Sequence, residues 1–130
     1  MVSLGLLQFE GDPLEKILAE SLPFEITPQQ VQQRLQAGEK LCLIDVREVM
    51  EYQTARIEGA SLVPMGTVPS RLGELEAQAE ATPLVVICHH GMRSLNVVNW
   101  LRQQGVEQCT SLAGGIDLWS REIDPNVPRY

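Results

Sequence analysis

Two short apolar runs stand out in the hydrophobic pattern of the chain, at residues 41–45 and 84–87. A continuous apolar run of this length is typical of a strand buried on both faces of a parallel sheet, because an exposed face would place a polar residue at every second position. Two further strands are predicted, one at residues 109–112 and a shorter one at residues 61–63 that ends at Pro64. These four segments predict the strands of a buried parallel sheet.

The segments between these strands carry helix signals. Thr27 and Gln30 form a capping box, and Val31 begins an apolar helix face that ends before Gly38. Strands that alternate with helices imply right-handed βαβ units, so we expect an α/β fold with helices on both faces of the sheet. Further helices are predicted at residues 12–20, 69–79, 93–104 and 116–121, with a helical turn at residues 48–52.

The length and composition fit one globular domain. The chain has 130 residues, of which 44% are apolar and 21% are charged, as is ordinary for a chain that folds alone. We expect an N-terminal helical extension at residues 1–22, a domain at residues 23–124 and an irregular tail at residues 125–130.

The acidic balance of the chain argues against two classes of partner. The net charge is −7 and the pI is about 4.7, whereas nucleic acids and anionic membrane surfaces attract basic patches. The sequence lacks an apolar run of about 18 residues, and its first ten residues lack the positive start of a signal peptide. We therefore predict a cytoplasmic protein without nucleic-acid or membrane partners.

The three cysteines differ in their surroundings. Because they contain no Cys-x-x-Cys pair, they predict neither a disulfide framework nor a zinc site. Cys42 and Cys109 stand in apolar runs and are expected to be small buried residues. Cys88 instead directly follows the predicted strand at residues 84–87, at the carboxyl edge of the sheet, where α/β folds bind ligands. Cys88 is therefore the candidate reactive thiol.

The residues after Cys88 are suited to stabilising a negatively charged sulfur. A cysteine reacts as its thiolate, and the free N–H groups at the start of a following helix favour an anion. Gly91 lets the backbone curl so that N–H groups face the sulfur. Arg93 adds a permanent positive charge, and Ser94 can cap the helix. We expect this loop to hold a thiolate or a bound anion.

Several charged and titratable residues near this edge allow more than one interpretation. His89 and His90 are expected to line the mouth of the loop or to assist proton transfer. A metal site is not predicted, because adjacent residues in a tight loop should point apart. Asp45 is expected in an ion pair or a turn cap, whereas Arg47 either joins that pair or faces the pocket. If Arg47 faces the pocket, Arg47, Arg56 and Arg93 would together attract anions to the mouth of the Cys88 loop.

Three stretches of the chain resemble signatures of the rhodanese-like sulfurtransferases. Residues 88–94, Cys-His-His-Gly-Met-Arg-Ser, resemble the active-site loop of that family. Residues 43–48 with residues 57–60 resemble its first segment, and residues 112–119 resemble its C-terminal one. The likeness covers about residues 25 to 122. Many relatives have a histidine where this chain has Arg56, so the role of that arginine is open, as is the role of the N-terminal extension.

The resemblance implies a five-stranded parallel sheet with helices on both faces, and covalent catalysis without a metal or cofactor. Cys88 would take a sulfane sulfur from a donor such as thiosulfate, become a persulfide, and pass the sulfur to a thiol or cyanide. The implied partners are a small anionic sulfur donor and a thiol or protein sulfur acceptor. The implied substrate-binding set is His89, His90, Gly91, Met92, Arg93 and Ser94, and we add Arg47 to it as a residue expected to face the pocket.

Two other functions are compatible with this loop. Cys-based phosphatases and arsenate reductases resemble a Cys-x5-Arg loop that is wide enough for a tetrahedral phosphoryl group. Arg93 follows Cys88 in the shorter Cys-x4-Arg spacing, which suits a single sulfur atom better. The second alternative is a non-catalytic rhodanese-like module used for regulation or docking, although such modules often lack the cysteine that this chain keeps.

Overall fold

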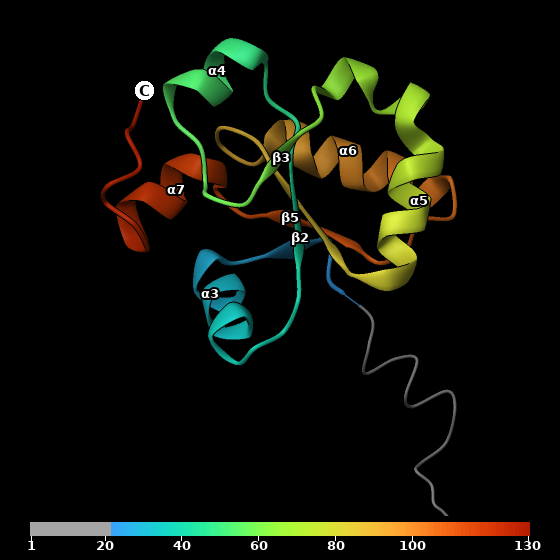
Figure 1. Ribbon diagram of the computed structural model, residues 1–130, viewed down its shortest axis with the longest axis horizontal. Coiled ribbons are helices and arrows are strands. Elements are labelled where there is room, and N and C mark those ends of the chain that lie inside the picture. Colours follow the sequence, from blue (N-terminus) through green and yellow to red (C-terminus); the bar gives the residue numbers. More distant parts are fainter. Residues whose placement is uncertain (1–21) are drawn as a thin grey trace, which may run out of the picture.

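The computed structural model describes residues 22–130 and contains a parallel sheet of five strands (Figure 1). The strands lie in the order β1-β5-β4-β2-β3, and every neighbouring pair is parallel. They are β1 (Glu25–Ile26), β2 (Cys42–Asp45), β3 (Ser61–Leu62), β4 (Leu84–Ile87) and β5 (Cys109–Leu112). The four predicted strands are confirmed. Strand β1 escaped prediction because its two residues carry no apolar run and are a strand only through pairing with β5.

The connections between the strands in residues 22–130 are helical. They contain α3 (Pro28–Gln36), α4 (Val49–Thr54), α5 (Leu72–Ala81), α6 (Met92–Gln103), α7 (Gly115–Glu122) and the 3-10 turns η2 (Met65–Thr67) and η3 (Pro69–Arg71). The predicted capping box is present: Thr27 Oγ1 accepts from the Gln30 backbone at 3.1 Å, and Gln30 Oε1 accepts from the Thr27 backbone at 3.0 Å. The helix predicted at residues 69–79 is wrong in its first turn, which is the separate turn η3. The helix predicted at residues 12–20 lies outside the described residues.

The core forms two apolar layers, one on each face of the sheet. Along β4, Leu84 and Val86 pack into the layer beneath α5 and α6, whereas Val85 and Ile87 pack into the layer beneath α3 and α7. Figure 1 shows these two pairs of helices on opposite sides of the strands. Because both faces are covered, the strand is apolar at every position, which explains its uninterrupted sequence pattern.

The topology brings the three signature segments of the sequence to one edge. All five strands run in the same direction, so their carboxyl ends meet, with β4 in the centre between β5 and β2. The loops that follow β2, β4 and β5 therefore lie next to one another at the position expected for a ligand site. Within residues 22–130, no helix is long and apolar enough to cross a membrane.

Candidate active site

Cys88 is the first residue after the central strand β4, and its side chain is only 1% exposed. The loop that follows curls back over the sulfur. The Gly91 backbone N–H donates to Cys88 Sγ at 3.1 Å. This contact requires the left-handed backbone of Gly91, whose φ is 104°, a conformation that side chains other than glycine rarely adopt. Of the several loop N–H groups expected to face the sulfur, the structure directs one, that of Gly91, at Cys88 Sγ.

Ser94 is fully buried and connects the sulfur to the sheet. The Cys88 thiol donates to Ser94 Oγ at 3.3 Å. Ser94 Oγ in turn donates to Gly91 O at 3.2 Å and lies 2.7 Å from Ser111 Oγ. The expectation that Ser94 caps α6 is wrong: Gly91 occupies the N-cap position, and Ser94 lies inside the first turn of the helix. Ser111, on β5, escaped the sequence analysis because its polar side chain stands in a short buried strand.

The segment after β5 holds the Cys88 loop in place. Two backbone N–H groups of α7 donate to the loop, Ile116 N to Cys88 O at 2.9 Å and Asp117 N to His89 O at 3.1 Å. This approach needs Gly115, since a Cβ atom there would overlap the carbonyl oxygens of Cys88 and His89. The sequence resemblance of residues 112–119 therefore has a physical basis, which is the close packing of two backbone segments.

Arg93 forms an ion pair with a carboxylate that the sequence did not indicate as part of the site. Its guanidinium forms a two-point ion pair with Glu51 of α4, at 2.8 Å from Nη1 to Oε1 and 2.9 Å from Nη2 to Oε2. The hydrogen bonds from Arg93 lower the pKa of the Glu51 carboxyl to about 2, and the same contact raises the pKa of Arg93. Glu51 is therefore ionised at neutral pH, and the positive charge predicted for the loop is compensated.

Tyr130 contacts the site from the tail that was expected to be irregular. Its hydroxyl donates to Glu51 Oε2 at 2.8 Å, and its ring stacks on His89 with 3.9 Å between ring centroids and 4° between planes. The C-terminal end of the described chain lies beside α4 in Figure 1, in agreement with these contacts. Nothing in the sequence near Tyr130 indicates this partnership, because 79 positions separate it from Glu51.

The expectation that Arg47 faces a pocket is wrong. Its side chain is fully buried, and it pairs with Asp45 at 2.6 Å from Nη2 to Oδ2 and 2.8 Å from Nε to Oδ1. The remaining contacts join Arg47 to the Ala55 carbonyl at 2.6 Å and to the Tyr130 hydroxyl at 2.9 Å. Arg47 thus fastens α4 and the tail to the end of β2, which is the structural ion pair that the sequence left as the alternative.

The two histidines lie together rather than apart, which corrects another expectation. The ring centroids of His89 and His90 are 3.9 Å apart, and their ligand atoms lie within 4.8 Å of the Asp117 carboxylate. These three groups could approach a metal ion. However, Asp117 accepts from Arg129 Nε at 2.9 Å, so a cation would have to displace a guanidinium. Burial, followed by the charge of His90, lowers the pKa of the His89 ring.

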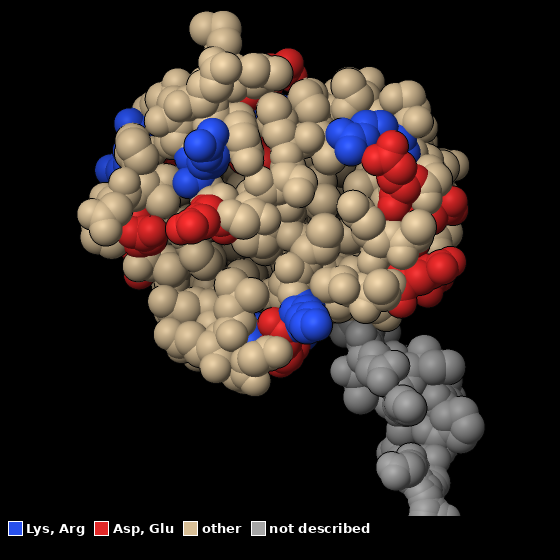
Figure 2. Space-filling model, in the orientation of Figure 1, with Lys and Arg blue, Asp and Glu red and all other residues tan. Residues whose placement is uncertain are grey.

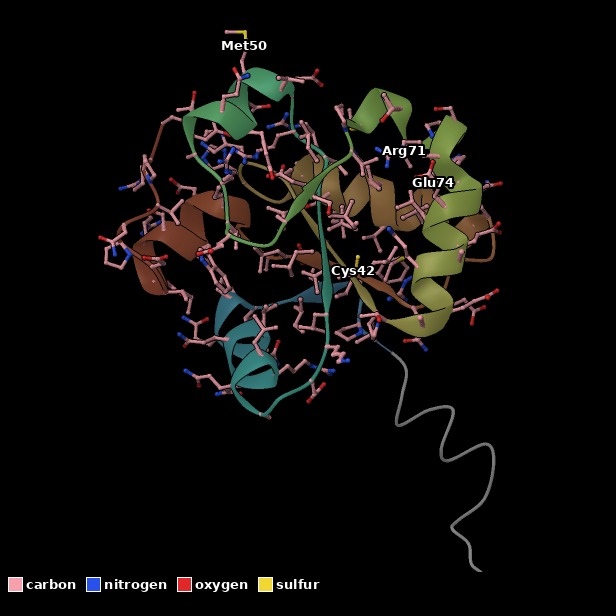
Figure 3. The ribbon with its side chains drawn as sticks, in the orientation of Figure 1. Cys42, Met50, Arg71 and Glu74 are labelled. Carbon is pink, nitrogen blue, oxygen red and sulfur yellow. The ribbon has the colours of Figure 1, made fainter. Side chains whose placement is uncertain are left out.

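The other predicted residues lie at the periphery. Met92 is 70% exposed at the start of α6, and Arg56 is an exposed residue whose guanidinium lies 5.0 Å from the centre of the Tyr52 ring. Cys109 is fully buried as expected, whereas Cys42 is only partly buried. Figure 3 shows Cys42 on the side of β2 toward α5, and partial burial raises the pKa of its thiol.

The fold and the loop together define an α/β domain with a buried cysteine after the central strand of a five-stranded parallel sheet. A family model described as a rhodanese-like domain matches residues 27–122. The chain therefore belongs to the rhodanese-like domain family, and the resemblance drawn from the sequence is confirmed.

Individual relatives agree with this assignment. The chain is 36% identical over 101 residues to YtwF of Bacillus subtilis, which carries a sulfurtransferase name, and the match covers 78% of this chain and 94% of YtwF. It is 32% identical to a maize adenylyltransferase and sulfurtransferase, MOCS3-1, over 91% of this chain but only 26% of that protein. A rhodanese-related protein of Thermoplasma volcanium superposes with a TM-score of 0.69 at 27% identity, over 83% of this chain and all of that one.

Proposed function

We propose that the protein is a sulfurtransferase in which Cys88 accepts a sulfane sulfur as a persulfide and passes it to a thiol or to cyanide. The observation that carries this proposal is the position of Cys88 Sγ, which follows the central strand and receives a hydrogen bond from Gly91 N–H at 3.1 Å. The sulfurtransferase name of YtwF, which matches over nearly its whole length, supports it.

The reaction needs two displacements at sulfur and no external oxidant. With thiosulfate as the donor, the Cys88 thiolate attacks the outer sulfur, a new S–S bond forms, and sulfite leaves with the electron pair of the broken bond. An acceptor thiolate or cyanide then attacks the terminal sulfur of the Cys88 persulfide and restores the thiolate. A cysteine is suited to both steps because its sulfur is a strong nucleophile and also a good leaving group.

The loop residues have different parts in this proposal. Gly91 and Ser94 contact the Cys88 sulfur directly and would orient the persulfide. His89, His90 and Met92 would border the path of the acceptor, with His90 and Met92 exposed on the surface. Arg93 would orient a donor through the guanidinium N–H groups that Glu51 leaves free. Arg47 has no part in binding because it is buried in its pair with Asp45.

Intact-protein mass spectrometry after incubation with excess thiosulfate or glutathione persulfide tests the proposal. We expect the mass to increase by one sulfur atom, the added sulfur to map to Cys88, and cyanide to remove it as thiocyanate. Cys88→Ser should abolish the adduct. Cys42→Ser is the matched control and should retain it, since Cys42 is more exposed but lies on β2, away from the loop.

Three results would contradict the proposal. An adduct that persists in Cys88→Ser and maps to Cys42 or Cys109 would show that the wrong thiol has been chosen. The absence of an adduct with either donor, in a folded protein that hydrolyses aryl phosphates or reduces arsenate, would favour the phosphatase or arsenate reductase alternative. A protein with neither adduct nor hydrolysis would be the non-catalytic module.

A further inference from the structure

Each guanidinium that contacts the Cys88 loop or its supports is paired with a carboxylate. Arg93 pairs with Glu51, Arg47 pairs with Asp45, and Arg129 pairs with Asp117, the residue whose backbone holds His89. Figure 2 shows a similar arrangement on the face in view, where basic side chains are separated from one another and several lie next to acidic ones. Of the three arginines expected to attract anions to the loop, Arg47 and Arg93 are therefore compensated, whereas Arg56 lies against the Tyr52 ring.

The Glu51 carboxylate is fixed in position by three parts of the fold. Besides the two hydrogen bonds from Arg93, Oε1 accepts from the Glu48 backbone at 2.9 Å and Oε2 accepts from the Tyr130 hydroxyl at 2.8 Å. The side chain of Glu51 is 21% exposed and that of Arg93 is 32% exposed, so water screens the pair only in part. A sulfur donor that binds Arg93 consequently lies next to the negatively charged carboxylate of Glu51.

The negative charge of the Glu51 carboxylate discriminates between sulfur donors according to the charge that they carry. Thiosulfate carries two negative charges within a few bonds of the sulfur to be transferred, and the sulfite that leaves carries both of them away. Such a dianion needs net positive charge at the site, because water near a protein surface only partly weakens the repulsion between like charges at contact distance. An organic persulfide, R–S–SH, places at most one charge on its sulfur atoms and none when it is protonated.

We infer that Glu51 is a specificity-determining residue that makes the Cys88 loop select an organic persulfide over thiosulfate as its sulfur donor. This inference rests on the proposed sulfur transfer to Cys88. The Cys88 thiolate attacks the terminal sulfur of R–S–SH, a bond forms between the two sulfur atoms, and the original S–S bond breaks. R–S⁻ leaves with the electron pair, and the proton stays on the new persulfide, so no oxidant or reductant is consumed.

Glu51→Gln tests the inference, because it removes the charge but keeps the size of the side chain and an oxygen that can accept from Arg93. The quantity to compare is the ratio of kcat/KM for thiosulfate to kcat/KM for glutathione persulfide, both with cyanide as acceptor. We expect this ratio to rise about tenfold in the variant, mainly through a lower KM for thiosulfate, which corresponds to one like-charge contact of modest strength. The matched control is Glu58→Gln, which changes the net charge equally at an exposed position and should leave the ratio unchanged.

A residue that only positions Arg93 would behave differently, since its loss would lower both rates together. An unchanged or lower ratio in Glu51→Gln would therefore overturn the inference. Failure of both donors to load Cys88 in the unaltered protein would instead contradict the proposed function, so the two failures can be told apart.

The salt dependence of the unaltered protein gives a second test that needs no variant. If the mouth of the loop is neutral or negative, kcat/KM for thiosulfate should stay constant or rise as the ionic strength increases, because salt screens repulsion. A steep fall would show that uncompensated positive charge attracts the dianion, and it would overturn the inference even if the Glu51 variant did not fold.

Discussion

At the scale of single residues, the Cys88 sulfur belongs to a chain of buried polar groups rather than to an isolated apolar pocket. Ser94 contacts Cys88 Sγ on one side and Ser111 Oγ on the other, and both serine side chains are fully buried. Buried hydroxyl groups are tolerated only when they are hydrogen-bonded. The two serines therefore stabilise each other, and they fix the environment of the thiol.

We predict that Ser94→Ala lowers the free energy of unfolding by about 1–2 kcal/mol, because the Ser111 hydroxyl loses its partner inside the protein. Urea unfolding followed by far-UV circular dichroism measures this loss. Ser111→Ala should cost less, because Ser94 keeps its contacts with Gly91 O and the Cys88 thiol. The double variant should cost less than the sum, since no Ser111 hydroxyl is then left unpaired. Additive losses would show that the 2.7 Å contact between the serines contributes nothing.

The exposed serine Ser70 provides the control. Its hydroxyl donates only to the Thr67 carbonyl at 2.9 Å on the surface. Ser70→Ala should consequently change the free energy of unfolding by no more than about 0.5 kcal/mol.

At the scale of elements, the start of α7 acts as a support for the Cys88 loop. Its first N–H groups, which have no partner within the helix, donate to the carbonyl groups of Cys88 and His89. The packing depends on Gly115, whose φ is 61° and whose missing side chain leaves room for those carbonyls. The loop and the helix are thus held together by backbone alone, which leaves the side chains of the loop free for chemistry.

We predict that Gly115→Ala lowers the free energy of unfolding by about 3 kcal/mol or more, because both the backbone conformation and the contact with the loop carbonyls become strained. Sulfur loading of Cys88 should fall together with stability. The control is Gly73→Ala, a helical position in α5 where an added Cβ has no atom within 4 Å. That variant should gain up to about 1 kcal/mol. A neutral Gly115→Ala would show that the loop does not depend on α7.

At the scale of the whole molecule, the arginines at the site, Arg47 and Arg93, are paired with carboxylates in a chain of net charge −7. The ion pairs of Arg93 and Arg47 join α4 to the Cys88 loop, to the end of β2 and, through Tyr130, to the tail. Electrostatic links of this kind contribute to stability only while the carboxylates stay ionised. The tail, which has no regular structure, is in this way connected to the site.

The pKa of Glu51 predicts how stability depends on pH. Arg93 lowers the pKa of Glu51 from 4.5 to about 2 in the folded protein, so the contribution of Glu51 is fully present above pH 4.5 and is lost as the pH falls toward 2. We expect the unaltered protein to lose stability more steeply over this range than Glu51→Gln, in urea unfolding at a series of pH values. Parallel curves for the two proteins would show that the ion pair contributes no pH-dependent stability. Glu58→Gln should follow the unaltered protein.

The sequence alone determined the features that depend on neighbours along the chain. The buried central strand β4 was visible because covering both faces of a sheet requires an apolar residue at every position. Helix α3 was visible because its cap residue lies three residues from its partner. The place of Cys88 after β4 followed in the same way. In contrast, the partners of the site depended on the tertiary structure, because nothing local relates Arg93 to Glu51, 42 positions away, or Ser94 to Ser111, 17 positions away. The sequence showed which residues carry charge, but only the fold decided which charges face each other. It paired Arg47 and Arg93, two of the three arginines expected to attract an anion, with carboxylates.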